Sequence, residues 1–149
     1  MKTLSQNKKA YFKYKVLEKF EAGMVLIGQE VKSIKEGKVN LLGSYVVLKN
    51  NELFLIGANV PLYQPKNAPS DYEPERSRKL LLKKSEIKYL IGKTKQKGLT
   101  LVPLRLYTKR GKIKLEFGIV KGKKKVDKRD LIKKRESERE MKRELKLRG

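Results

Sequence analysis

Lysines interleaved with aromatic residues near the N-terminus offer the most suggestive chemistry in this sequence. Asn7, Lys8 and Lys9 lead into an alternating run that contains Phe12 and Tyr14. Lysine ammonium groups bind phosphates, and an aromatic ring provides a face on which an unpaired base can stack. We expect Phe12 to pack in the core and Tyr14 to face a nucleic acid, so this segment is the first candidate interface.

A second basic segment surrounds the apolar run 80–82. The cations Arg76, Arg78 and Lys79 come before the run, and Lys83 follows it. Charge at both ends of a buried strand suggests the rim of a binding face. An ordinary solvated loop explains the same pattern equally well.

The third basic segment begins at Lys121 and has no aromatic residue. Gly122 lies among four lysines, including Lys123 and Lys124, and a glycine there lets the backbone approach a phosphate closely. Many basic linkers have this composition, so the segment alone is not specific. Residues 121–149 contain 14 basic and 6 acidic residues with few apolar ones. We expect this tail to be disordered alone and helical when a polyanion supports it.

The overall charge supports the same interpretation. The 149 residues include 39 Lys and Arg against 16 Asp and Glu, a net charge of +23. Such an excess destabilises a compact fold by self-repulsion, and its usual partner is nucleic acid.

Catalysis has little support in the residue types. There is no Cys and no His, so thiolate chemistry, the commonest general base and the commonest metal ligand are all missing. No phosphate-binding glycine motif and no distinctive carboxylate pair is present. We therefore expect no enzyme activity, no metal and no cofactor. The sequence has no apolar leader and no membrane span, which predicts a cytoplasmic protein, expected to be monomeric.

Apolar periodicity indicates the elements that position these side chains. It predicts about six short strands and two short helices, without the strand–helix alternation of parallel sheets. Residues 1–10 are expected to be loose. One helix is expected over 28–37, ending at Gly37, and another from an N-cap at Ser85 to a stop before Gly98. The strands are expected at 11–20, 45–49, 53–56, 79–82, 99–107 and 113–120, with a strand-like run at 24–27.

Turn residues connect these strands. Asn50 and Asn51 tolerate the positive φ of a tight hairpin, and Arg110-Gly111 joins the last two strands. Pro103 should lie at an edge or a bulge. Many short strands in a nucleic-acid-binding chain favour a mainly β fold with peripheral helices, an OB-like small antiparallel β-barrel over 1–120, followed by the basic tail 121–149.

Six ordered sequence blocks resemble the tmRNA-binding protein family, also called SsrA-binding protein or small protein B. They are NKKA at 7–10, FEAG at 20–23, GQEVKSI at 28–34, RSRKLLL at 76–82, GLTLVPLRLY at 98–107 and GKKKVDKR at 122–129. The resemblance implies an OB-like barrel whose partners are the tRNA-like domain of tmRNA and the decoding site of stalled ribosomes.

The resemblance also implies roles for individual residues. RNA contact is implied for Asn7, Lys9, Tyr14, Glu21, Leu81, Lys83, Gly122, Lys123 and Lys124, and a ribosome-decoding role for Asp127, Lys128 and Arg129. Val126 stands where the family often has an aromatic residue or His. Lys83 stands where the family often has Asn or His. Whether Val126 contacts a base, and whether Lys83 contacts a base or a phosphate, are therefore open.

Two other functions fit the composition. A ribosomal or ribosome-assembly protein would also be basic and tailed, and a single-strand-binding OB protein would share the expected barrel. Selective capture of one structured, aminoacylatable RNA would favour the rescue adaptor. Stoichiometric presence on every ribosome, or binding to any single strand, would favour the others.

Overall fold

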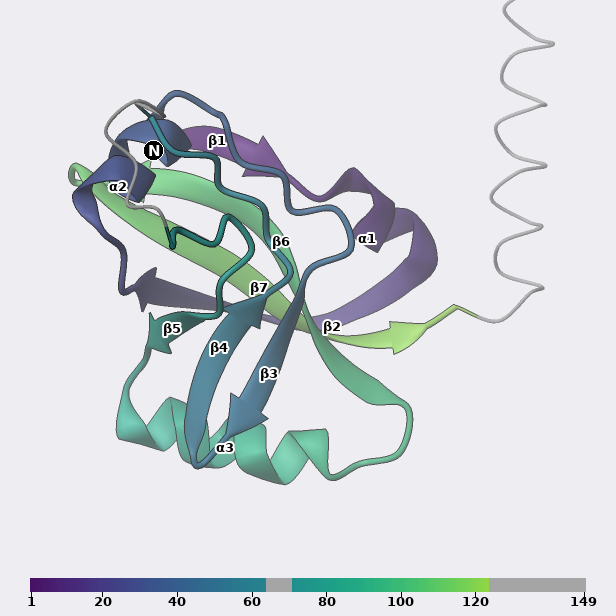
Figure 1. Ribbon diagram of the computed structural model, residues 1–149. Coiled ribbons are helices and arrows are strands. Elements are labelled where there is room, and N and C mark those ends of the chain that lie inside the picture. The colour runs from purple at the N-terminus through teal and green to yellow at the C-terminus, as the bar shows by residue number, and fades with distance from the viewer. Residues whose placement is uncertain (64–70, 124–149) are drawn as a thin grey trace, which may run out of the picture.

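A computed structural model describes residues 1–63 and 71–123. This part of the chain is mainly β-sheet with three helices (Figure 1). The elements in chain order are β1 (Lys2–Gln6), α1 (Lys8–Lys13), β2 (Tyr14–Met24), α2 (Gly28–Lys35), β3 (Tyr45–Lys49), β4 (Glu52–Ile56), β5 (Arg78–Leu81), α3 (Lys84–Thr94), β6 (Leu99–Lys109) and β7 (Lys112–Gly122).

The strand pairings close on themselves. All pairs are antiparallel, in the order β1-β6-β3-β4-β5-β2-β7, and β7 also pairs with β6. Six strands therefore form a closed circuit, and β1 is added outside it along β6. Helix α3 lies beyond the β3–β4 hairpin, and α1 leads into β2 on another side of the sheet (Figure 1).

Alternating residues of the strands fill the interior. Leu53 and Leu55 of β4 and Leu115 and Phe117 of β7 are buried, while the residue between the two members of each pair is partly exposed. Leu90 of α3 joins this core. The period of two is that of a sheet with one buried face, as the sequence predicted.

The two hairpin turns are as expected. Asn50 and Asn51 have φ of 52° and 59°, and Arg110 and Gly111 have φ of 53° and 75°. Two consecutive left-handed residues give the turn that matches the twist of paired strands. The β6–β7 hairpin is the longest pairing of the sheet and shifts register between Pro103 and Arg105, the bulge expected at this proline.

The N-terminus was predicted wrongly. Residues 1–10 are not loose, because β1 pairs with β6 from Lys2 to Gln6 and α1 follows. The expected strand over 11–20 starts only at Tyr14. Phe12 belongs to α1 and is half-buried, outside the two buried clusters of the described residues.

Two boundaries also differ. Residues 25–27 are not a strand, although the Val25 N–H donates to the Lys79 carbonyl at 2.9 Å. Ser85 is not the N-cap of α3. Lys83 takes that place with extended backbone, and its N–H donates to the Glu86 carboxylate at 3.2 Å. This carboxylate satisfies the N–H of the N-cap residue from three residues downstream, which is one half of a capping box.

Candidate nucleic-acid interface

Asn7 fixes the first candidate site against the bulge of β6. Its side-chain N–H donates to the Pro103 carbonyl at 2.9 Å, and its backbone N–H donates to the Leu104 carbonyl at 2.8 Å. Its side chain is buried. Since a proline and its bulge leave ladder carbonyls without strand partners, Asn7 supplies the missing donors. Its main role is to anchor α1.

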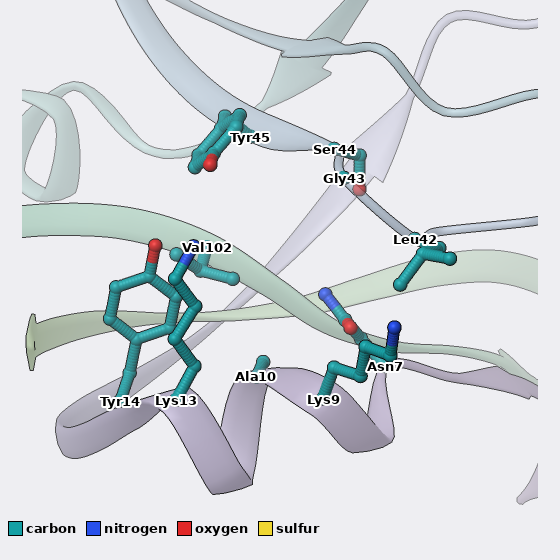
Figure 2. Close-up of a pocket in the computed structure, with 10 residues that line it drawn as sticks. All are labelled: Asn7, Lys9, Ala10, Lys13, Tyr14, Leu42, Gly43, Ser44, Tyr45 and Val102. Atoms are coloured by element: carbon teal, nitrogen blue, oxygen red, sulfur yellow. The ribbon is translucent and has the colours of Figure 1, made fainter. Parts of the chain in front are cut away.

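A cavity of about 200 Å³ opens beside this anchor (Figure 2). Tyr14 lies on one side, and Tyr45, the first residue of β3, lies on the other. Val102 forms part of its apolar lining. Lys9 and Lys13 from α1 are the charged residues of the lining. The Lys13 ammonium lies 5.5 Å from the centroid of the Tyr14 ring.

The basic segment at the end of β7 adjoins the same helix. Gly122 pairs with Tyr14 in the sheet, and the Lys123 ammonium donates to the Tyr11 carbonyl at 2.8 Å. Lys8 is exposed on α1. The expected residues of the first and third segments therefore meet at one place. Lys124, Asp127, Lys128 and Arg129 lie outside the described residues.

Glu21 lies near the other end of β2 and forms a second candidate site. One of its carboxylate oxygens, Oε2, accepts a hydrogen bond from the Tyr107 hydroxyl and lies 3.5 Å from the Lys109 ammonium. The hydrogen bond from Tyr107 lowers the pKa of Glu21, and Lys109 and Lys114 add to this effect against a smaller opposing effect of burial. Burial and the hydrogen bond to Glu21 raise the pKa of the Tyr107 hydroxyl. Glu21 is thus held as a carboxylate with its second oxygen available as an acceptor.

A hollow of about 370 Å³ lies at the end of β2 beyond Glu21, where Gly23 and Met24 belong to its lining. Leu81 lines it and is 52% exposed, and it pairs with Gly23 of β2. Lys35, Lys112 and Lys114 are the charged residues of its lining. An exposed leucine beside three cations suits the sugar or base of a nucleic acid, whose phosphates would meet the lysines.

Arg78 is not part of an exposed rim, which corrects the sequence prediction for this residue, while Arg76 is partly exposed. The Arg78 side chain is fully buried, and its five N–H groups face Glu30 at 2.7 Å, the carbonyls of residues 58, 74 and 76, and the Tyr72 hydroxyl. The Arg76 Nε donates to Glu30 at 3.1 Å, and a second nitrogen pairs with the same carboxylate. Glu30 sits in α2, far away in sequence, so the partner that buries these cations was not evident.

This ion cluster is internally satisfied. Burial raises the pKa of Glu30, but hydrogen bonds from Arg76, the Ile27 N–H and Arg78 outweigh it and leave the pKa lowered. A charged carboxylate surrounded by donors ties α2 to β5. Arg78 therefore stabilises the fold and is not available to a ligand, whereas Arg76 keeps 32% of its side chain exposed beside its ion pair with Glu30.

The remaining predicted residues are exposed. Lys79 lies on β5, 3.2 Å from the Glu52 carboxylate, with both side chains nearly half exposed. Lys83 precedes α3 and is exposed. Tyr45, Tyr107 and Lys109 were missed by the sequence reasoning. Only the strand register could have found Tyr107, since its partner Glu21 is 86 residues away.

Two features are absent from the described residues. No helix there is long and apolar enough to cross a bilayer. No group of three or more His, Cys, Asp or Glu side chains that could hold a metal ion occurs there.

Comparison with known proteins supplies the family. The family model described as SmpB protein matches residues 4–147. An SsrA-binding protein of Trichodesmium erythraeum is 50% identical over 97% of this chain and 93% of its own length, and one of Syntrophobacter fumaroxidans is 51% identical over 93% and 85%. A solved chain described under "tmRNA-SmpB: a journey to the center of the bacterial ribosome" matches with a TM-score of 0.65 and 44% identity over 81% of this chain and 85% of that one. The family model over residues 4–147 and these relatives at about half identity show that this chain is a member of the SmpB protein family.

Proposed function

We propose that this chain is a non-catalytic RNA-binding adaptor, which binds the tRNA-like domain of tmRNA and delivers it to stalled ribosomes for trans-translation in the cytoplasm. The observation that carries the proposal is the pair of hollows on β2, each lined by lysines and by aromatic or apolar side chains. Relatives named for SsrA binding, and a solved relative described with tmRNA and the ribosome, agree with it.

The two sites have different tasks in this proposal. The first, at α1, binds backbone phosphates through Lys8, Lys9 and Lys123 while Tyr14 offers an aromatic face. The second uses the free oxygen of Glu21, which accepts a hydrogen bond from a base amino or imino group and therefore reads identity. Lys83 and Lys79 add cations beside Leu81, which gives apolar contact. Charge alone cannot discriminate between RNAs, so selectivity depends on the second site.

The fold suits this task. We infer that the closed circuit of six strands is an OB-like barrel, because antiparallel closure around an apolar core is typical of small β-barrels, and the OB fold is the one of these that binds nucleic acids. The body, residues 1–120, would carry RNA binding, and residues 121–149 would carry the contact with the ribosome. Within that second segment, Asp127, Lys128 and Arg129 are assigned to the decoding site.

Binding measured against salt tests the RNA function. The full-length protein should bind the tRNA-like domain of tmRNA more tightly than an elongator tRNA of equal length. If about six phosphates are neutralised, log affinity should fall against log salt with a slope of roughly −4 to −5. If the protein binds both RNAs with equal affinity, and binds unstructured RNA equally well, it is a general single-strand binder instead.

Matched lysine variants localise the interface. Lys9→Ala should lower affinity for both RNAs and make the slope less steep by about 1. Lys49→Ala removes the same charge at the opposite end of β3 from Tyr45 and should leave the slope unchanged. If the two variants behave alike, the α1 face is not the phosphate site.

Truncation after Lys125 separates the two partners. The shortened protein should retain selective tmRNA binding with a modest loss, because Gly122 to Lys124 remain. It should fail in peptide tagging on stalled ribosomes in a reconstituted translation system, because the three assigned decoding residues are gone. Full tagging activity would remove the ribosomal role from this segment.

A further inference from the structure

Two residues that line the cavity between α1 and residues 42–45, Lys13 and Tyr45, have no role in the proposed function. We propose that it is a one-nucleotide subsite, which receives a single unpaired nucleotide of the bound RNA with its base against Tyr45 and its phosphate at Lys13. This proposal rests on the proposed RNA function and adds Tyr45 and Lys13 to the interface.

The size of the cavity limits the ligand. Its volume of about 200 Å³ is below the roughly 300–1,000 Å³ of sites for drug-sized molecules. Tyr14 and Tyr45 face it from opposite sides, and Val102 and Leu42 complete an apolar lining (Figure 2). A narrow space with aromatic and aliphatic walls suits one flat ring.

The charges select an anion that carries such a ring. Lys9 and Lys13 line the cavity, and no acidic residue does. The Lys13 ammonium stays close to the Tyr14 ring, at 5.5 Å from its centroid, so a ligand that enters beside this ring also meets the cation. A nucleotide combines a planar base with a phosphate one sugar away. An acidic peptide would use the lysines but has no base for the tyrosine face.

The wall that carries Tyr45 is preformed. Gly43 has φ of +74°, and the buried Ser44 hydroxyl donates to the Leu41 carbonyl at 2.5 Å. The Leu42 N–H donates to the Asn40 side-chain oxygen at 2.9 Å. This turn is therefore held by its own hydrogen bonds, while the Tyr45 and Leu42 side chains remain 38% and 53% exposed. Exposed apolar side chains on a fixed turn bind a ligand with little loss of conformational entropy.

Removal of the ring tests the subsite in the full-length protein. Tyr45→Ala should weaken binding to the tRNA-like domain of tmRNA by about 5- to 150-fold, the range of one lost base–aromatic stack. Its salt slope should stay at the wild-type value because no charge is removed. Tyr45→Phe should restore affinity. Tyr89→Ala, which truncates a similarly exposed tyrosine on α3, is the matched control and should bind normally.

An abasic scan of the RNA completes the test. At one unpaired position, removal of the base should lower the affinity of wild-type protein as much as the Tyr45→Ala substitution does. The same base removal should lower the affinity of the Tyr45→Ala variant only slightly further. The subsite is wrong, even though the RNA function stands, if Tyr45→Ala binds tmRNA as tightly as wild type does. It is also wrong if every base removal lowers the affinity of the variant and of wild type equally. If wild-type protein does not prefer tmRNA, the proposed function and the subsite fall together.

Discussion

The buried ion cluster gives the sharpest quantitative prediction. Glu30 is fully buried, and its carboxylate pairs with Arg78, which is also fully buried, and with Arg76. Glu30→Gln keeps the side-chain volume but leaves a buried guanidinium without its counter-charge. Loss of one partner of a buried ion pair costs about 3–5 kcal/mol. We expect the free energy of unfolding of Glu30→Gln to fall by this amount at pH 7.

The corresponding change in melting temperature follows from the size of the body. At about 2.1 cal/mol/K per residue, roughly 120 folded residues unfold with an entropy of about 250 cal/mol/K, so 1 kcal/mol shifts Tm by about 4 °C. A loss of 3–5 kcal/mol therefore lowers Tm by about 12–20 °C. Far-UV circular dichroism during heating and urea titration gives both quantities.

Glu52→Gln is the matched control. Its partner Lys79 lies at 3.2 Å, as in many ion pairs, but both side chains are about 45% exposed. Surface pairs contribute about 0–1 kcal/mol, so this variant should melt within about 4 °C of wild type. If Glu30→Gln and Glu52→Gln lower the melting temperature by similar amounts, burial of the Glu30 ion pair does not determine its contribution to stability.

The dependence on pH checks the sign of the same effect. The folded pKa of Glu30 is lowered, so its contribution is present above the unfolded value of about 4.3 and is lost as pH falls through the folded pKa. The difference in stability between wild type and Glu30→Gln should narrow below about pH 4.

The RNA affinity of Glu30→Gln distinguishes a stabilising role of Arg76 and Arg78 from direct RNA contact. At a temperature well below the lower Tm, folded Glu30→Gln should bind tmRNA like wild type. A variant of normal stability with weakened binding would mean that Arg76 and Arg78 are ligand residues after all.

Four further changes have smaller expected effects. Tyr107→Phe removes the hydrogen bond that lowers the pKa of Glu21, so the loss of selective tmRNA binding on acidification should begin at higher pH, measured by filter binding with the fold checked by circular dichroism. Asn7→Ala leaves the Pro103 carbonyl without its side-chain donor and should cost about 1–3 kcal/mol in urea unfolding. A Cβ at Gly118 would lie 3.0 Å from a backbone oxygen of β2, whereas one at Gly92 meets nothing within 4 Å. Gly118→Ala should therefore lower stability by about 1–3 kcal/mol, and Gly92→Ala in α3 should raise it by up to about 1 kcal/mol.

Local signals explain the elements that were predicted from the sequence. The alternation in β4 and β7 and the Asn50-Asn51 turn depend on neighbouring residues only, so a short window is enough. β1 was missed because its residues, KTLSQ, hold one large apolar side chain. It forms through pairing with β6, about 100 residues later. No local pattern reports such a partner.

The site residues divide in the same way. The lysines of α1 were predicted as exposed cations, and Lys8 and Lys9 are exposed. Arg78 looked identical in sequence, but Glu30, 48 residues earlier, buries it. Burial of a cation depends on whether the fold brings it an anion. That information lies in the topology and not in the composition of the segment.

The spacing of the two sites explains how a protein of such high charge could select one RNA. Tyr14 and Glu21 lie seven residues apart on β2, which spans at most about 23 Å at 3.3 Å per residue because the register shifts between Val16 and Glu18. The Debye length is about 8 Å at physiological salt, so the cations at one site contribute almost nothing at the other. An RNA gains from both only if its own structure places a phosphate and a base donor at that separation. A flexible strand would lose entropy to reach both sites, whereas a folded RNA with the right spacing would not. Selectivity then arises from the rigid length of one strand, and the net charge supplies the affinity.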